Sequence, residues 1–132
     1  YLSAYDIEDI SEREIIKNNG EKEFRDVESQ IIREVALISG AVISLGGGAV
    51  IRDENVSNLK LNGKLIYIKR DLSLLSCDNR PLSQKFGVKE LYEKRKDIYD
   101  SVKDGEVLND GDLNEVALKV VKEYENSCYK RC

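Results

Sequence analysis

The chain has 132 residues, 41% of them hydrophobic and 35% charged, which predicts one soluble domain with a single core. It contains no histidine, so Ser-His-Asp catalysis, Cys-His catalysis and histidine-ligated zinc are excluded. The 21 basic and 25 acidic residues give a net charge of −4, which argues against nucleic acid and anionic membranes as partners, and no apolar run approaches the roughly 20 residues of a membrane span.

The N-terminal part of the chain predicts two helices. Ser11 and Glu14 form a capping box ahead of a short helix, which we expect to end near Gly20. Apolar residues then recur every three or four positions from Glu21 to Ser39, which predicts a long amphipathic helix. Its predicted inward face consists of Phe24, Val27, Ile31, Val35 and Ile38.

The middle of the chain predicts two strands on either side of a helix. Ala41–Leu45 is short, apolar and contains β-branched residues, which is typical of a buried strand, and it leads directly into Gly46–Gly48. Asp53 is predicted to cap a helix over Glu54–Leu61. The apolar run within Lys64–Lys69 predicts a second buried strand.

The C-terminal part predicts a loop, two helices and a strand. Residues 70–87 are polar, contain the single proline, and are expected to form a lid-like loop. Val88–Val102 predicts a helix, and Glu106–Leu108 predicts a short strand. Asp112 is predicted to cap the last helix. The predicted inward face of that helix consists of Leu113, Val116, Val120 and Tyr124.

This alternation of strands and helices predicts an α/β fold, a three-layer arrangement with a parallel sheet flanked by helices. We expect residues 1–132 to form a single domain and a monomer. Ligands bind such sheets beyond the carboxyl ends of the strands. The loops expected there are residues 46–52, 70–87 and 109–111.

Three cysteines are present, Cys77, Cys128 and Cys132. Their number is odd, and their spacing fits neither a disulfide framework nor a metal site. We therefore expect reduced thiols in a cytoplasmic protein.

Four features could carry chemistry, and each has a plain structural alternative. The glycines of Gly46–Gly48 let a ligand approach main-chain N–H groups, or they form only a flexible turn. Arg25 and Glu28 lie one helical turn apart, a spacing that by itself favours a surface ion pair. The proline after Arg80 favours an extended backbone at this arginine. Its side chain then either binds a phosphate or carboxylate, or is a solvated loop charge. Arg95 lies among other charges, and composition does not distinguish it from them.

Taken together, four segments resemble the shikimate kinase family and occur in the family's order, from about Ser11 to the C-terminus. The first two, at this separation, are the specific part of the resemblance. The segments are Gly20-Glu21-x-x-Phe24-Arg25-x-x-Glu28, Val42-Ile43-Ser44-Leu45-Gly46-Gly47-Gly48-Ala49-Val50, Arg80-Pro81-Leu82 and Leu91-x-x-x-Arg95-x-x-x-Tyr99.

The resemblance implies a P-loop nucleoside monophosphate kinase-like fold and the transfer of the ATP γ-phosphate, with Mg²⁺, to the 3-hydroxyl of shikimate in aromatic amino-acid biosynthesis. It implies that Arg25 and Arg95 hold the shikimate carboxylate and that Glu28 orients Arg25. Gly46–Gly48 would line the floor of the substrate site. Ser44 would lie near the waters of the magnesium ion.

On the nucleotide side, the resemblance implies that Arg80 binds ATP and acts as a catalytic residue by closing over the transferring phosphoryl group. Asn109 and Asp110 would lie beside adenine. The family's first strand, its Gly-x-x-Gly-x-Gly-Lys-Ser/Thr loop and its Asp-x-Asp strand have no counterpart here. We therefore expect the first βα unit, on the order of 30 residues, to be missing, and the 132 residues to be unable to phosphorylate shikimate by themselves.

Two alternatives to a shikimate kinase stay open. One is a non-catalytic shikimate-binding or interaction module that has lost its nucleotide site. The other is a related small-molecule kinase, such as a gluconate kinase, which the Phe-Arg-x-x-Glu and triple-glycine pair disfavours.

Overall fold

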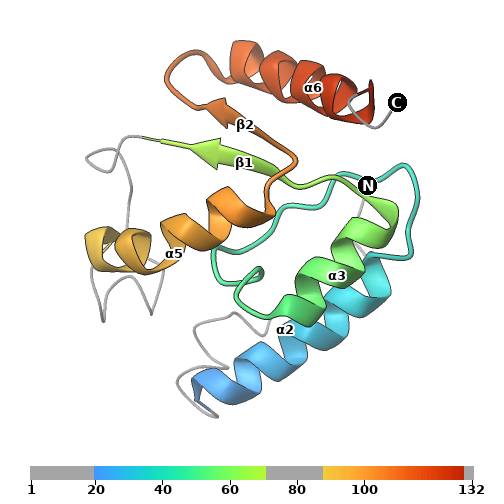
Figure 1. The fold of residues 1–132 in the computed structure, drawn as a ribbon, viewed down its shortest axis with the longest axis vertical. Coiled ribbons are helices and arrows are strands. Elements are labelled where there is room, and N and C mark those ends of the chain that lie inside the picture. Colours follow the sequence, from blue (N-terminus) through green and yellow to red (C-terminus); the bar gives the residue numbers. More distant parts are fainter. Residues whose placement is uncertain (1–19, 71–87, 130–132) are drawn as a thin grey trace.

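The computed structural model describes residues 20–70 and 88–129. The short helix predicted after Ser11, the lid-like loop from residue 71 onward with Arg80, and the thiols of Cys77 and Cys132 lie outside the described residues. In chain order the elements are α2 (Glu21–Val35), α3 (Asp53–Asn62), β1 (Ile66–Lys69), α5 (Val88–Val102), β2 (Gly105–Leu108) and α6 (Leu113–Tyr129), as Figure 1 shows.

The first long helix, α2, begins where predicted and ends earlier, at Val35 instead of Ser39. It starts after Gly20, whose φ of 86° is readily adopted by glycine. Its buried residues are Arg25, Ser29, Ile32 and Val35. Of the predicted inward face only Val35 is buried, and the other four residues are half-buried. The polar residues Arg25 and Ser29 are buried instead, which apolar periodicity does not predict.

A small apolar core lies between α2 and α3. Its buried members are Ile32, Ala49 and Leu59, with Leu45 and Leu65 packed against them. The start of α3 corrects one prediction: Asp53 is the first helical residue, and Arg52 takes the cap position without a side-chain capping bond. Asp53 still places a negative charge in the first turn, where the helix dipole favours it.

The segment 41–45 does not form the predicted strand. Residues 41–46 have no regular secondary structure, and within the described part of the chain no backbone hydrogen bond joins 41–45 to another segment. Val42 is 93% exposed. A strand needs a neighbour that completes its hydrogen-bond ladder, and the apolar, β-branched pattern of 41–45 does not provide that neighbour.

The sheet consists of β1 and β2, which run parallel, with Ile66 opposite Gly105 and Lys69 opposite Leu108. Helix α6 covers one side of this sheet and α5 lies on the other (Figure 1). The predicted arrangement of helices on both sides of a parallel sheet is therefore present around these two strands.

Strand β1 is shorter and less buried than predicted. It begins at Ile66 and not at Lys64, because the N–H of Leu65 donates to the Asp104 Oδ2 atom at 2.8 Å instead of joining the ladder. Ile68 is 44% exposed. Among the described residues β1 has a partner strand on one edge alone, so it is less covered than a strand inside a wider sheet.

Helix α5 has its predicted bounds, and α6 begins as predicted after Asp112. The Asp112 Oδ2 atom accepts the N–H groups of Asn114 at 3.1 Å and Glu115 at 3.4 Å, which confirms the predicted cap. Two residues of the predicted inward face are wrong, since Leu113 is 78% and Tyr124 is 51% exposed. The side of α6 that is least exposed consists of Val116, Val120, Glu123 and Ser127.

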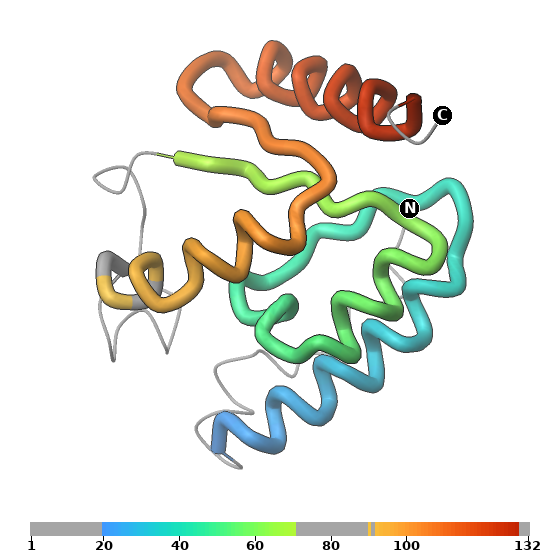
Figure 2. The backbone as a smooth tube through the Cα atoms, viewed as in Figure 1, coloured from blue at the N-terminus to red at the C-terminus, as the bar shows by residue number. Residues whose placement is uncertain are grey.

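The elements form two regions, traced as a tube in Figure 2. The two-helix region, residues 20–63, contains α2, α3 and the chain between them; the sheet region, residues 64–70 and 88–129, contains β1, β2, α5 and α6. An ion pair of 3.6 Å between Lys60 and Asp104 joins the regions, as does the packing of Leu65 against the core. Among the described helices, none is long and apolar enough to cross a membrane.

Candidate functional site

Residues 46–52, which we call the glycine loop, lie between α2 and α5. Two backbone hydrogen bonds fold the loop tightly, from the Ala49 N–H to the Gly46 carbonyl and from the Ile51 N–H to the Gly48 carbonyl, each at 3.1 Å. Gly48 is buried, and a Cβ atom on it would overlap the guanidinium of Arg25. The absence of a side chain at this position therefore allows Arg25 to pack against the backbone of the loop.

Arg25 projects from α2 with a side chain only 9% exposed. Its Nη1 atom donates to the Glu28 Oε1 atom at 2.8 Å, and its guanidinium lies 4.9 Å from the ring centroid of Phe24. The Nε atom is buried without a hydrogen-bond partner in the described part of the chain, the Glu21 carboxylate being 3.9 Å away. A guanidinium has five N–H donors, so Arg25 retains donors for an anionic ligand.

Arg95 and Tyr99 approach the glycine loop from α5. They lie one helical turn apart and so share a helix face. A Cβ atom on Gly47 would lie 3.0 Å from both the Arg95 Nη1 atom and the Tyr99 Oη atom. The Tyr99 hydroxyl donates to the Gly47 carbonyl at 2.6 Å. The glycine loop thus contacts α2 through Gly48 and α5 through Gly47.

The structure brings six of the predicted site residues together. They are Arg25, Glu28, Gly46, Gly47, Gly48 and Arg95. Gly46 also faces Glu28, whose Oε2 atom lies 3.8 Å from the position of a Cβ atom on this glycine. With Glu21, which pairs with Arg25 at 3.9 Å, the cluster holds two guanidinium groups and two carboxylates, so an anion would be bound by the geometry of the guanidinium donors and not by a surplus of charge.

Asn55 and Arg52 fix the shape of the glycine loop. Asn55, 1% exposed, donates through Nδ2 to the Ala49 carbonyl at 2.9 Å, and its Oδ1 atom has no partner among the described residues. Arg52 donates through Nη1 to the Ser29 Oγ atom at 3.2 Å and pairs through Nη2 with Asp26 at 2.8 Å. The hydrogen bond from Arg52 holds the pKa of Asp26 below its ordinary value.

Sequence reasoning assigned no role to Tyr99, Asn55 or Arg52. The spacing of four residues between Arg95 and Tyr99 was a usable signal, because it places both on one helix face. The position of Asn55 in the first turn of α3 carried no comparable signal, since an amide there is usually solvated. The role of Arg52 depends on side chains of α2 that are more than 20 residues away in sequence.

Of the remaining predicted site residues, the structure describes Ser44, Asn109 and Asp110. Ser44 is exposed and lies in segment 41–45, which has no regular secondary structure. At the carboxyl end of the sheet the Asn109 N–H donates to the Lys69 carbonyl at 2.7 Å, and Asp110 lies 3.5 Å from Lys119. Arg80 is outside the described residues. In residues 20–70 and 88–129, His, Cys, Asp and Glu side chains do not form a group of three that could hold a metal ion.

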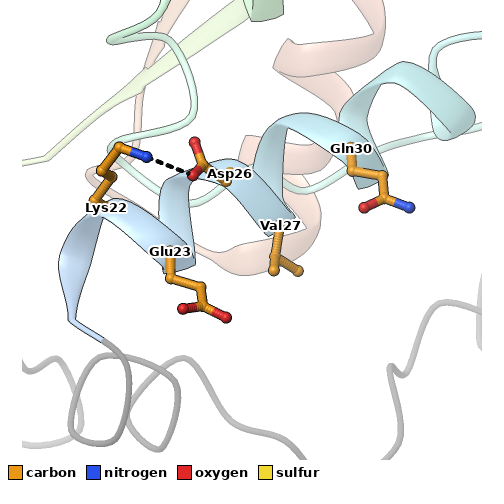
Figure 3. Close-up of a pocket in the computed structure, with 5 residues that line it drawn as sticks. All are labelled: Lys22, Glu23, Asp26, Val27 and Gln30. Atoms are coloured by element: carbon orange, nitrogen blue, oxygen red, sulfur yellow. Dashed lines mark hydrogen bonds and ion pairs between the residues drawn. The ribbon is translucent and has the colours of Figure 1, made fainter.

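A separate hollow of about 390 Å³ lies on an exposed face of α2 (Figure 3). Its lining residues are Lys22, Glu23, Asp26, Val27 and Gln30. None of them is among the buried residues of α2, and the ion pair of 3.1 Å between Lys22 and Asp26 occupies part of it. The hollow therefore belongs to the solvated side of the helix, away from Arg25.

The fold and this geometry define an α/β protein in which a glycine loop separates an arginine on one helix from an arginine on another. The family model described as shikimate kinase matches residues 6–125. The chain belongs to the shikimate kinase family.

Three relatives, each named shikimate kinase, illustrate this similarity. A protein of Clostridium botulinum (strain Alaska E43 / Type E3) is 38% identical over 109 residues, covering 78% of this chain and 66% of the relative. One of Thermodesulfovibrio yellowstonii is 36% identical over 124 residues, covering 85% and 70%. One of Cupriavidus pinatubonensis is 40% identical over 99 residues, covering 68% and 52%. The chain spans about two thirds of the length of the first two relatives.

Proposed function

We propose that the chain belongs to an enzyme that transfers the γ-phosphate of ATP to the 3-hydroxyl of shikimate, and that its described part supplies the shikimate site. The observation that carries this proposal is the placement of Arg25 and Arg95 on opposite sides of the glycine loop. The names of the relatives support the same substrate and the same reaction class.

Shikimate is a carboxylate with three ring hydroxyls, and each part has a counterpart in the proposed site. Arg25 and Arg95 bind the carboxylate, because planar guanidinium groups form strong paired hydrogen bonds with it. Burial of Arg25 strengthens this interaction by removing competing water. Glu28 holds Arg25 in place through the 2.8 Å bond, and the backbone of Gly46–Gly48 forms the floor that the ring approaches.

The nucleotide side of the proposal follows the family resemblance. Arg80 acts on the transferring phosphoryl group, Asn109 and Asp110 lie beside adenine, and Ser44 lies near the magnesium waters. ATP supplies the phosphoryl group when it is bound with Mg²⁺. We further propose a monomeric cytoplasmic protein with no nucleic-acid or membrane partner.

Calorimetric titration of the 132-residue chain with shikimate tests the substrate site. We expect saturable binding at one site per chain. Arg25→Gln and Arg95→Gln should each weaken shikimate binding by about tenfold or more, as expected for loss of a hydrogen bond to a charged group. Arg33→Gln is the matched control, because Arg33 is exposed on the same helix as Arg25 and should leave the affinity unchanged.

Two results would contradict this site. One is the absence of shikimate binding by a chain whose circular dichroism shows it to be folded, and the other is an equal loss in Arg33→Gln. Release of ADP with shikimate and MgATP tests the reaction separately. Because the 132 residues by themselves are expected not to phosphorylate shikimate, this assay uses the chain preceded by the family's phosphate-loop unit. Intact shikimate binding without ATP binding or ADP release by that chain would favour the non-catalytic shikimate-binding module instead.

A further inference from the structure

The two arginines of the proposed site belong to different regions of the molecule. Arg25 lies on α2 in the two-helix region, whereas Arg95 lies on α5 in the sheet region. Their separation therefore depends on how the regions are joined. Among the described contacts, the hydrogen bond from Tyr99 to the Gly47 carbonyl joins them at the site itself, while the pair of Lys60 and Asp104 joins them at the end of α3.

Tyr99 is held at both of its ends. Its ring packs on that of Tyr67 in β1, with centroids 5.0 Å apart and planes inclined by 54°. Its hydroxyl donates to Gly47 at 2.6 Å. Burial raises the pKa of Tyr67 to about 12, so this supporting ring is uncharged at neutral pH. The side chain thus connects a strand of the sheet with the glycine loop, one helical turn from Arg95.

We propose that Tyr99 is a positioning residue, which holds the glycine loop and Arg25 at the separation from Arg95 that one carboxylate ligand requires. The identity of that ligand rests on the proposed function. The geometry supports the coupling, because the Arg95 Nη1 and Tyr99 Oη atoms both lie 3.0 Å from the position of a Cβ atom on Gly47. A shift of the loop therefore changes both contacts at once. Binding groups must be held within about 0.5 Å of their productive positions, so a small shift is enough to weaken binding.

The decisive variant is Tyr99→Phe, which keeps the ring on Tyr67 and removes the hydroxyl. We expect shikimate affinity to fall about fivefold, the effect of one neutral hydrogen bond. In an Arg95→Gln background the same change should cause no further loss, because Tyr99 acts by placing Arg95 and Arg25 together. Tyr129→Phe is the control: it removes a hydroxyl from an exposed tyrosine of α6 and should leave affinity unchanged.

Amide hydrogen exchange measured without ligand separates the proposed role of Tyr99 from the proposed shikimate site. Amide hydrogen exchange at Ala49 and Ile51, which close the glycine loop, should be faster in Tyr99→Phe than in wild type and unchanged in Tyr129→Phe. Gly47→Ala, which pushes against the Tyr99 hydroxyl, should produce the same increase if Tyr99→Phe does not fold.

Unchanged amide exchange in both Tyr99→Phe and Gly47→Ala would overturn the role of Tyr99, whatever ligand the chain binds. Fully additive losses in Tyr99→Phe and Arg95→Gln would also overturn it, because Tyr99 would then act independently of Arg95. Failure of the wild-type chain to bind shikimate would instead contradict the proposed function, and the exchange result would then decide the role of Tyr99 alone.

Discussion

The two regions of the molecule are stabilised in different ways. The two-helix region surrounds a small apolar core of Ile32, Ala49 and Leu59 and buries polar side chains beside it, Arg25, Ser29 and Asn55. In the sheet region Val107 of β2 and Val116 of α6 are buried, and the elements are also joined by the backbone ladder of β1 and β2 and by ion pairs near the surface. These pairs join Lys69 to Glu106 and Lys103 to Asp100. Large apolar side chains of α6 are exposed there, among them Leu113, Leu118 and Tyr124.

This difference shows where the proposed site obtains its precision. Buried polar groups are expensive to displace, since each must keep its partner, so the two-helix region holds Arg25 and the glycine loop in one arrangement. Exposed ion pairs contribute little and tolerate change. The sheet region therefore supplies a scaffold, and it reaches the site through Arg95 and Tyr99.

The largest expected effect tests whether the close approach of Arg25 to the glycine loop is required. Gly48→Ala places a methyl group where the buried guanidinium lies, so Arg25 must move. We expect shikimate affinity, measured by calorimetry, to fall by about tenfold to a hundredfold. Gly111→Ala is the control, because its Cβ atom would make an ordinary contact, 3.6 Å from the Glu115 carboxylate, outside the proposed shikimate site. Equal losses in the two variants would contradict this assignment.

A second prediction concerns the stability of the two-helix region. Asn55→Ala leaves the buried Ala49 carbonyl without its 2.9 Å hydrogen bond. The free energy of unfolding in urea should fall by about 1–2 kcal/mol, the lower part of the usual range for an unpaired buried group, because the Asn55 Oδ1 atom is already unpaired. Asn58→Ala, at a half-buried position of the same helix, should cost less than about 0.5 kcal/mol. A larger loss in Asn58→Ala would show that side-chain truncation alone explains the effect.

The third prediction concerns the stability of the sheet region. A Cβ atom on Gly105 would lie 2.6 Å from the Glu123 Cγ atom, so Gly105→Ala forces α6 or Glu123 to shift. We expect a loss of about 1 kcal/mol in the free energy of unfolding, with unchanged shikimate affinity. Gly111→Ala, whose Cβ atom would lie 3.6 Å from Glu115, should leave both quantities unchanged. A loss of shikimate affinity in Gly105→Ala would contradict the conclusion that the sheet region serves as a scaffold and tolerates change.

The smallest expected effect is a pH dependence in the sheet region. Hydrogen bonds from Lys103 and Lys69 lower the pKa of Glu106 from its ordinary 4.5 to about 2. A carboxyl whose pKa is lowered by folding stabilises the folded state above the unfolded value, so this contribution should be lost as the pH falls from 4.5 towards 2. Glu106→Gln should reduce this slope of melting temperature against pH, whereas Glu125→Gln on α6 should not. The change should be small because Glu106 is exposed.

Local sequence signals predicted the elements better than their faces. Periodicity predicted α2, α5 and α6, the expected cap at Asp53 predicted α3, and the carboxylate of Asp112 predicted the start of α6. The inward faces of α2 and α6 were only partly right: Val35 and Val116 are buried as predicted, but other members are half-buried or exposed, because burial depends on the partner that a helix meets. The predicted strand at 41–45 failed for a related reason, since a ladder needs a second strand. The motifs nevertheless named six residues that the structure places around one loop.

The sequence by itself determined the helices, the two strands of the sheet and the family, because these depend on local spacing and on short motifs in a fixed order. Only the tertiary structure decided that Arg25 is buried, that Asn55 holds the Ala49 carbonyl and that Tyr99 reaches Gly47. The last of these contacts joins residues 52 positions apart. The partner of a polar side chain is chosen by the packing of whole elements, and this information is not contained in the neighbourhood of any single residue.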